Sequence, residues 1–132
     1  MDKKIDFLGI PIDALTMQET VNKIEGVILK NNQIHHSAVN AGKVVLMQSD
    51  IELKKSVLNA DLINADGQSI VWAACFLGKK IPERVSGIDL MERLVVKSYE
   101  KGYKCFFFGA SEIIVKELVN RYSNNYSNDI IA

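Results

Sequence analysis

Two segments of this chain carry residue types suited to catalysis, an acid–glycine turn at Asp66-Gly67 and a loop that contains Arg84. Asp66 follows the apolar pair Leu62-Ile63 and precedes an apolar helix, so its carboxylate stands at a strand-to-helix turn. A carboxylate held in a cleft can accept the proton of an attacking sugar hydroxyl. The Arg84 guanidinium matches phosphate oxygens and would stabilise a nucleoside-diphosphate leaving group. Together they are typical of a transferase that uses a nucleotide-activated donor.

Both residues also have purely structural interpretations. Asp-Gly is a common turn pair, so Asp66 can act as a turn former or a helix N-cap. Arg84 can be a surface arginine paired with Glu83 or Asp89. Residue spacing alone does not choose between these alternatives.

Three further residues are candidates for substrate binding. Asn40 ends a predicted strand and starts a helix, so N-cap is its default role, and its amide can also bond a sugar hydroxyl. Gly109 follows the apolar run 104–108 and can admit a phosphate or sugar at a helix N-terminus. Gln68 is expected to line the turn that precedes its helix.

The histidines and cysteines show no metal-ligand spacing. His35 and His36 are adjacent and point to opposite faces of a strand, so at most one faces any site, and a structural role is favoured. Cys75 and Cys105 each stand among apolar residues, which predicts buried free thiols and a reducing cytosol. Trp72 is expected in the core.

The apolar pattern predicts strands that alternate with helices. This indicates an α/β fold, which we expect to be Rossmann-like and three-layered, with a mainly parallel sheet and flanking helices. Ligands gather at the carboxyl ends of the strands in such sheets. Capping boxes are expected at Thr16–Glu19 and Ser86–Asp89, and Gly78 is expected to end the helix 70–77. The first predicted strand or strand pair is 5–12, ended by Pro11 and Asp13. The other predicted strands are 34–39, 62–63, 104–108 and a start at 130–131. The predicted helices begin near 17 and 41 and cover 51–58, 70–77 (buried), 87–101 and 112–122, before a polar loop at 123–128.

Length and charge limit the function classes. The chain has 132 residues, which suits a single α/β domain over residues 1–132. Its formal net charge is zero, so no global basic field attracts nucleic acid. The apolar run after Lys4 is too short for a signal peptide because Asp6 interrupts it, and no stretch approaches the roughly 20 apolar residues that span a bilayer.

Four segments carry a resemblance to a known family. They are Val-Asn-Ala at 39–41, Asn-Ala-Asp-Gly-Gln-Ser-Ile-Val-Trp-Ala at 64–73, Pro-Glu-Arg-Val-Ser-Gly-Ile-Asp-Leu-Met at 82–91, and Phe-Phe-Phe-Gly-Ala at 106–110. In this order, over essentially the whole chain, they resemble the WecG/TagA/CpsF glycosyltransferases. The resemblance implies an inverting enzyme of bacterial cell-wall or surface-polysaccharide synthesis, such as teichoic acid synthesis, that is cytoplasmic or at the inner face of the membrane.

The resemblance also implies substrates and residue roles. N-acetylmannosamine, or its uronic acid, would move from a UDP donor to N-acetylglucosamine on undecaprenyl diphosphate, without a metal or another cofactor. Asp66 matches the proposed general base, Asn40 an acceptor-side position, and Arg84 the arginine assigned to phosphate or carrier contacts. The family usually has Thr-Pro-Asn where this chain has Ala38-Val39-Asn40, so a threonine hydroxyl contact is missing at Val39.

Family members continue well past the length of this chain. We therefore expect an amino-terminal portion that lacks the later donor-binding and membrane-targeting part. The alternative is a catalytically inactive truncated paralogue that binds a precursor or a protein partner. A homo-oligomer is also expected, because the strand begun at 130–131 would leave an open edge and because family members self-associate.

Overall fold

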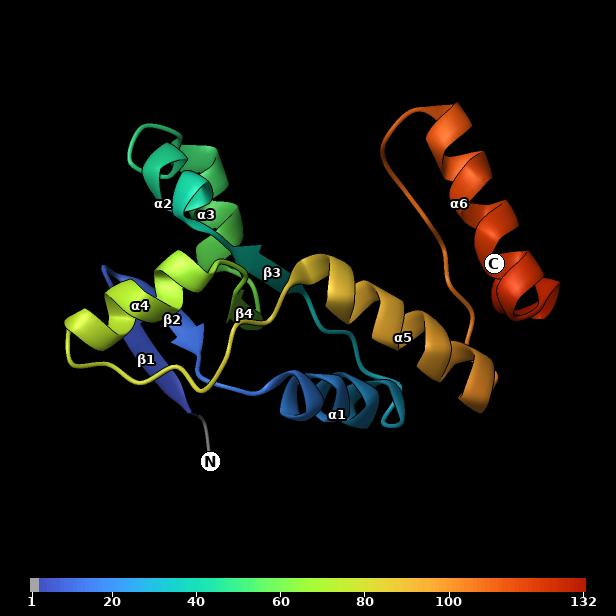
Figure 1. Cartoon of the computed structure of the whole chain (residues 1–132), viewed down its shortest axis with the longest axis horizontal. Helices are drawn as coiled ribbons and strands as arrows, with labels where there is room; N and C mark the ends of the chain where they lie inside the picture. Colours follow the sequence, from blue (N-terminus) through green and yellow to red (C-terminus); the bar gives the residue numbers. More distant parts are fainter. Residues whose placement is uncertain (1–2) are drawn as a thin grey trace. The chain divides into compact units, whose positions relative to one another are not determined.

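The structure, a computed structural model, describes residues 3–132, and their contacts cluster into two compact units (Figure 1). The first ends at Leu90 and the second is Met91–Ala132, so the boundary falls within the helix α5 (Gly87–Lys101). Helices alternate with short strands, which confirms the predicted α/β class. The described strands form one antiparallel and one parallel two-stranded sheet. The Rossmann-like, three-layer arrangement of a mainly parallel sheet with flanking helices stays a prediction.

The first unit opens with a β-hairpin. β1 (Lys4–Phe7) and β2 (Ile10–Asp13) pair in antiparallel register, with Phe7 opposite Ile10. The two-residue turn Leu8-Gly9 has φ values of 52° and 81°, as a type I′ turn requires. This confirms the strand pair, but Pro11 lies within β2 instead of ending it. Pro11 stands opposite Asp6, one position beyond the pair that closes the hairpin, where the antiparallel ladder needs no N–H.

The first helix, α1 (Met17–Ile28), begins at the predicted capping box. The Thr16 hydroxyl accepts the Glu19 N–H at 3.2 Å, and the Glu19 carboxylate accepts the Thr16 N–H at 2.8 Å. The Lys3 ammonium donates to the same carboxylate at 2.6 Å. The Lys3 bond, followed by the Thr16 backbone bond, lowers the pKa of Glu19 to about 2. The helix start is thus fixed by local sequence and tied to β1.

The parallel sheet holds the centre of the first unit. β3 (His36–Val39) pairs with β4 (Leu62–Ala65), and α2 (Ala41–Leu46) with α3 (Ile51–Leu58) forms the crossover between them. A crossover is needed because parallel strands start at the same edge of the sheet. Every residue of β4 is buried, and three of its four residues are apolar, with Asn64 the exception. The core includes Phe7, Ile10, Ile12, Val39, Met47, Val57, Ile63, Ala65, Ile70 and Ala74.

The helix α4 (Gln68–Phe76) is exposed where the sequence predicts burial. Only Ile70 and Ala74 are buried, because these residues lie one turn apart on the face that packs against the core. The predictions of a core Trp72 and a buried Cys75 thiol are therefore wrong: the Trp72 side chain is 69% exposed, and Cys75 is a free, exposed cysteine. Apolar composition identified the helix but not what covers it.

The predicted stop at Gly78 is confirmed. Gly78 has a φ of +71°, which favours glycine. Its N–H donates to the Cys75 carbonyl at 3.0 Å, and the Lys79 N–H donates to the Ala74 carbonyl at 2.8 Å. These two bonds make a Schellman motif that closes the last turn of α4.

The second unit contains the rest of α5, α6 (Glu112–Asn125) and the short 3₁₀ helix η1 (Asn128–Ile130). The predicted strand at 104–108 is wrong: these residues form only an isolated parallel bridge between Cys105 and Ile131. The Cys105 N–H donates to the Ile130 carbonyl at 2.6 Å. The strand predicted to start at 130–131 is therefore present only as this one bridge. The predicted loop at 123–128 is partly wrong because α6 continues to Asn125.

The core of this unit is small. Buried Tyr122 stacks on Phe107 with ring centroids 5.6 Å apart, alongside Val95 and Ile130. Cys105 is partly exposed, and its thiol donates to the Ser98 hydroxyl at 3.2 Å. Within residues 3–132, no helix is long and apolar enough to cross a membrane.

Candidate active site

The carboxyl ends of β3 and β4 bring Asn40 and Asp66 to one edge of the parallel sheet. The register places Val39 opposite Ala65, so the residue that follows each strand leaves the sheet at the same edge. The Asp66 N–H donates to the Val39 carbonyl at 2.9 Å, which ties the two strand ends together. This edge is where parallel α/β sheets hold their ligands.

The Asp66 side chain is available for chemistry. It is not the N-cap of α4, because Gly67 takes that position and offers no side-chain cap. Within residues 3–132, the Asp66 carboxylate has no hydrogen bond or ion pair, and its residue is partly exposed. The N-cap interpretation is therefore wrong, and both carboxylate oxygens are free to accept a proton or hydrogen bond from a ligand.

Asn40 has the N-cap role that its position predicts. Its side-chain oxygen accepts the Lys43 N–H at 2.9 Å at the start of α2. The side-chain NH₂ has no acceptor within residues 3–132, so it can still donate to a substrate hydroxyl. A Cβ at Gly67 would lie 3.7 Å from the Asn40 Cβ, so the two strand-end turns are in close contact.

The loop that carries Arg84 is fixed beside β4. The Val85 N–H donates to the Ala65 carbonyl at 2.8 Å, one residue before Asp66. The Arg84 guanidinium donates to the Asp89 carboxylate at 3.5 Å, and both side chains are about half exposed. Of the two predicted partners Asp89 is thus the one observed, since the Glu83 carboxylate accepts the Met17 N–H at the start of α1. Exposed pairs of this kind are weak, so Arg84 can exchange Asp89 for a phosphate.

The two remaining candidates are less constrained. Gln68 is exposed at the first position of α4, next to the Asp66-Gly67 turn. Gly109 lies in the second unit, shortly before α6, and its φ of +122° favours glycine. Their roles in substrate binding stay predictions.

Two residues beside Asp66 were missed by sequence reasoning. A Cβ at Gly87 would lie 3.8 Å from the Asp66 carboxylate and 3.4 Å from the Ala38 Cβ. The first turn of α5 therefore faces the strand ends, and glycine leaves space there. Ala38 faces this space, whereas Val39 is fully buried. No local pattern reveals these neighbours, because they come from three separate segments.

A buried polar network lies beneath the site. The Asp13 carboxylate is 1% exposed, accepts the Ile63 N–H at 2.9 Å, and forms ion pairs with Lys23 at 3.2 Å and Lys4 at 3.5 Å. Asn64, also fully buried, donates to the Asp13 carbonyl at 3.5 Å. These bonds connect the hairpin and α1 to the strand that ends at Asp66, so they set the position of that strand.

His36 extends the network, which supports the structural role predicted for one of the two histidines. The Asn64 side-chain NH₂ donates to the Thr20 hydroxyl at 3.3 Å, so its oxygen is left to accept from the His36 Nε2–H at 3.1 Å. Burial, the largest cause, lowers the pKa of His36, and the bond to Asn64 opposes this only in part. The ring therefore favours its neutral form.

Replacing His36 by glutamine is expected to reduce the loss of stability in mild acid. Because the folded pKa lies below the unfolded value, the neutral ring stabilises the fold fully above about pH 6.5, and this stabilisation is lost as pH falls through the folded value. Denaturant midpoints at about pH 7.5 and about pH 5 measure the effect. Wild type should lose more stability than His36→Gln, and the exposed neighbour variant His35→Gln should behave like wild type. Equal losses in wild type and His36→Gln would contradict the assignment.

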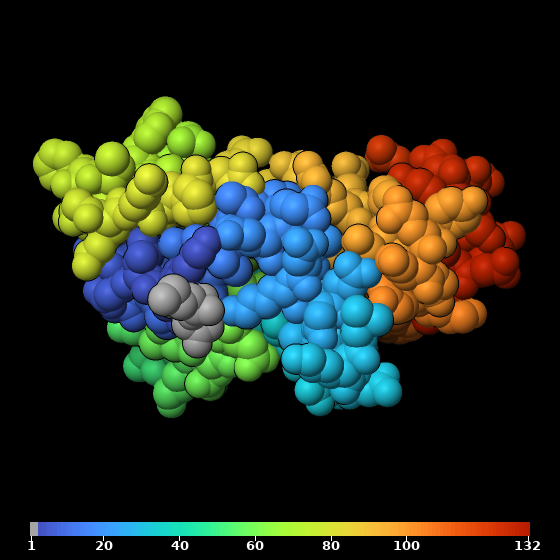
Figure 2. All heavy atoms as spheres, turned by 90° about the horizontal axis from the view of Figure 1, so that it is seen from below, coloured from blue at the N-terminus to red at the C-terminus, as the bar shows by residue number. Residues whose placement is uncertain are grey.

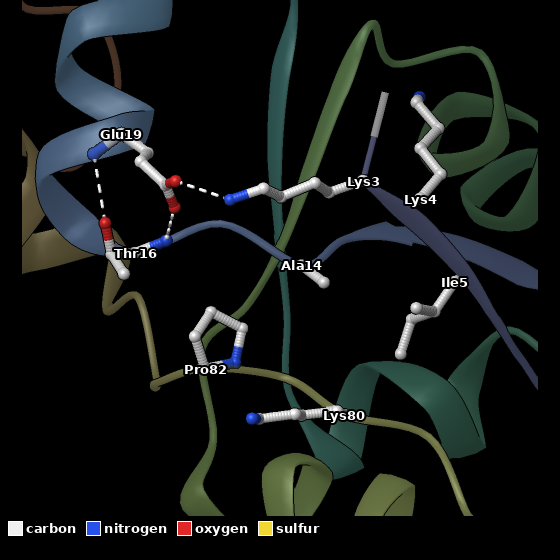
Figure 3. Close-up of a pocket in the computed structure, with 8 residues that line it drawn as sticks. All are labelled: Lys3, Lys4, Ile5, Ala14, Thr16, Glu19, Lys80 and Pro82. Atoms are coloured by element: carbon white, nitrogen blue, oxygen red, sulfur yellow. Dashed lines mark hydrogen bonds and ion pairs between the residues drawn. The ribbon is translucent and has the colours of Figure 1, made fainter. Parts of the chain in front are cut away.

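Two surface hollows of the first unit lie away from Asp66. One, of about 400 Å³, is lined by Lys3, Lys4, Lys80 and Glu19 among others (Figure 3). The other, of about 650 Å³, lies between α1 and the segment before β3, where Ile28 and His35 contribute to its wall. Neither of these two hollows is lined by Asp66, Asn40 or Arg84.

Comparison with known proteins identifies relatives. The model of the glycosyl transferase WecG/TagA/CpsF family matches residues 5–132. A protein of Staphylococcus aureus (strain NCTC 8325) is 26% identical over 130 residues, which is 95% of this chain and 50% of the relative. One from Bacillus spizizenii is 31% identical over 74 residues, which is 56% of this chain and 29% of the relative. Both relatives are named N-acetylglucosaminyldiphosphoundecaprenol N-acetyl-beta-D-mannosaminyltransferase. The chain spans half the length of the Staphylococcus relative and less of the Bacillus one.

Proposed function

The chain belongs to the WecG/TagA/CpsF family of glycosyl transferases, and we propose that it acts in the transfer of N-acetylmannosamine, or its uronic acid, from a UDP-sugar to N-acetylglucosamine-diphospho-undecaprenol. The observation that carries this proposal is the Asp66 carboxylate, which stands without a partner among residues 3–132 at the carboxyl ends of two parallel strands. The names of the relatives support the N-acetylmannosaminyl group and the lipid-linked N-acetylglucosamine acceptor. The UDP donor and the uronic acid rest on the family resemblance. The polymer would be a teichoic acid or another surface polysaccharide.

The proposed step is an inverting displacement. Asp66 accepts the proton of the acceptor 4-hydroxyl as its oxygen attacks the anomeric carbon of the donor sugar. The new carbon–oxygen bond forms on the face opposite the bond to UDP, which breaks and releases UDP with its electron pair. The Asn40 side-chain NH₂ donates to a hydroxyl of the acceptor, and Gln68 contributes a further substrate contact.

Arg84 would stabilise diphosphate charge in this reaction. Its guanidinium is held only by the exposed Asp89 carboxylate, 3.5 Å away, so a diphosphate can compete for it. The hydrogen bond from the Val85 N–H to the Ala65 carbonyl holds the residue after Arg84 against the residue before Asp66. The diphosphate can belong to the donor or to the lipid carrier, and either would be bound by the same charge-assisted bonds.

The proposal extends to organisation and location. Residues 1–132 would be a single α/β domain within a Rossmann-like, three-layer, mainly parallel fold. The protein would work in the cytoplasm or at the inner face of the membrane, without a metal or another cofactor, and would self-associate. The single domain and the layered fold rest on chain length and the apolar pattern, and the location and the lack of a cofactor rest on the family resemblance. Self-association rests on both the resemblance and the predicted open strand edge.

The test is direct measurement of sugar transfer. With UDP-N-acetylmannosamine and a soluble analogue of lipid-linked N-acetylglucosamine, we expect release of UDP matched by formation of the β-linked disaccharide. Inversion at the anomeric carbon, read by NMR of the product, should accompany it. A folded chain that binds UDP but forms no product would overturn the proposed transfer and favour the precursor-binding alternative.

A further inference from the structure

The loop that carries Arg84 is attached on both sides of that residue. The carboxylate of Glu83, directly before it, accepts the N–H of Met17, the first residue of α1. The N–H of Val85, directly after it, donates to the Ala65 carbonyl at 2.8 Å, and the Val85 side chain is buried. Arg84 therefore stands between one attachment to α1 and another to the end of β4.

The attachment to α1 joins two segments that are far apart in sequence. Glu83 and Met17 are 66 residues apart. Figure 2 shows the yellow segment around residues 80–85 against the blue segment around residues 15–20. Pro82 and Thr16, which precede the two bonded residues in the chain, line the same hollow of about 400 Å³ (Figure 3). The loop is thus packed against the start of α1 and not only bonded to it.

The start of α1 offers a donor that its own capping box leaves free. In that box Thr16 accepts the Glu19 N–H, and Glu19 accepts the Thr16 N–H, so the Met17 N–H has no acceptor within the helix. Glu83 supplies this acceptor, and its negative charge is favourable at a helix N-terminus. The bond therefore restrains the Glu83 side chain and the loop backbone that follows it.

The same bond keeps the charge of Glu83 away from Arg84. Among residues 3–132, the Arg84 guanidinium pairs only with Asp89, at 3.5 Å, although Glu83 is its direct neighbour in the chain. A free Glu83 carboxylate would compete with a phosphate for the guanidinium. With Glu83 bound to α1, one exposed carboxylate alone opposes a phosphate at Arg84.

We propose that Glu83 is a positioning residue, which holds Arg84 so that its guanidinium binds the diphosphate of a substrate. The inference rests on the proposed function, in which Arg84 stabilises that charge. Glu83 does not touch the substrate and acts through Arg84, because a binding group that is already held in place loses less conformational entropy when the ligand binds. The diphosphate belongs to the UDP donor or to the lipid-linked acceptor, and both present the same phosphate oxygens.

Binding of two diphosphate probes by the full chain tests the proposal. One probe is UDP, and the other is N-acetylglucosamine diphosphate that carries a short alkyl chain in place of undecaprenol. Arg84→Ala should raise the dissociation constant of one probe by roughly 10- to 100-fold, as expected for the loss of charge-assisted hydrogen bonds. The more affected probe identifies the source of the diphosphate.

Variants of Glu83 are then measured with that probe. Glu83→Ala should raise its dissociation constant by roughly 10-fold, within the range of coupling between neighbouring residues. Glu83→Gln keeps an oxygen that accepts the Met17 N–H, so it should bind within about two-fold of wild type. In the Arg84→Ala background, Glu83→Ala should cause no further loss, because the group that it positions is absent.

The matched control is Thr16→Ala. It removes the local cap of α1 and keeps the bond to Glu83, so it should lower the urea midpoint and leave probe binding unchanged. An equal loss of binding in Thr16→Ala would overturn the proposal, because it would show that only the stability of the helix start matters.

Three other results would also overturn the proposal: unchanged binding by Glu83→Ala, additive losses in the double variant, or a wild-type chain that binds neither probe. The proposed function can fail separately. A chain that shows the expected pattern of binding but transfers no sugar would overturn the proposed transfer and leave the role of Glu83 in place.

Discussion

Replacing Asp66 by asparagine is expected to lower the rate of sugar transfer by roughly 100- to 10,000-fold, the range associated with loss of a general base. Asparagine keeps the size and shape of the side chain but cannot accept the proton of the acceptor hydroxyl. The Asp66 carboxylate has no structural bond within residues 3–132, so the fold should tolerate the change. The free energy of unfolding should stay within roughly 0.5 kcal/mol of wild type.

The matched control is Asp6→Asn. Asp6 is exposed on β1 and, like Asp66, has no side-chain partner within residues 3–132. Initial rates at saturating donor and acceptor, with urea midpoints for both variants, separate chemistry from folding. Near-wild-type turnover by a folded Asp66→Asn protein would remove Asp66 from the role of base. A rate loss that only follows unfolding would do the same.

Replacing Asp13 by alanine is expected to destabilise the first unit by about 2–4 kcal/mol, because a buried N–H loses its acceptor and two ion pairs are lost. Asp13 accepts the Ile63 N–H at 2.9 Å and pairs with Lys23 and Lys4 at 3.2 and 3.5 Å. These groups come from the hairpin, α1 and β4, so the loss acts on the packing of three elements. Lys4 and Lys23 are about one-third exposed and can regain water, which limits the loss.

Chemical denaturation followed by circular dichroism measures this effect. Asp13→Asn keeps an acceptor for the Ile63 N–H but loses the charge, so its cost should lie between wild type and Asp13→Ala. Asp6→Ala, on the exposed face of the same hairpin, should change stability by no more than roughly 0.5 kcal/mol. If Asp13→Ala also changed the free energy of unfolding by no more than roughly 0.5 kcal/mol, the network would contribute little to stability.

Features with short sequence separation were predicted well. The capping box at Thr16, the N-cap at Asn40 and the glycine stop at Gly78 were found where expected. The helix 51–58 has the predicted bounds. These features depend on bonds between residues three to five apart, so the local sequence contains both partners.

Features that need a partner from elsewhere were predicted poorly. The apolar run 104–108 has strand composition but only one bridge, because a strand exists only where another strand offers its hydrogen-bonding edge. Trp72 has core composition but faces outward, because Ile70 and Ala74 occupy the face of α4 that contacts the core. Composition gives the apolar character of a side chain and not what packs against it.

The candidate site divides in the same way. The sequence by itself determined that an acid–glycine turn follows a buried strand and that an arginine loop comes soon after, and its motifs determined the family. Only the tertiary structure decided that Gly67, not Asp66, takes the N-cap, which leaves the Asp66 carboxylate unpartnered within residues 3–132. It also decided that Asn40 and Gly87 lie beside this turn. The physical reason is that two long-range contacts position β4. One is its parallel pairing with β3, and the other is the hydrogen bond from the Ile63 N–H to the Asp13 carboxylate, 50 residues away in sequence. No local pattern encodes either contact.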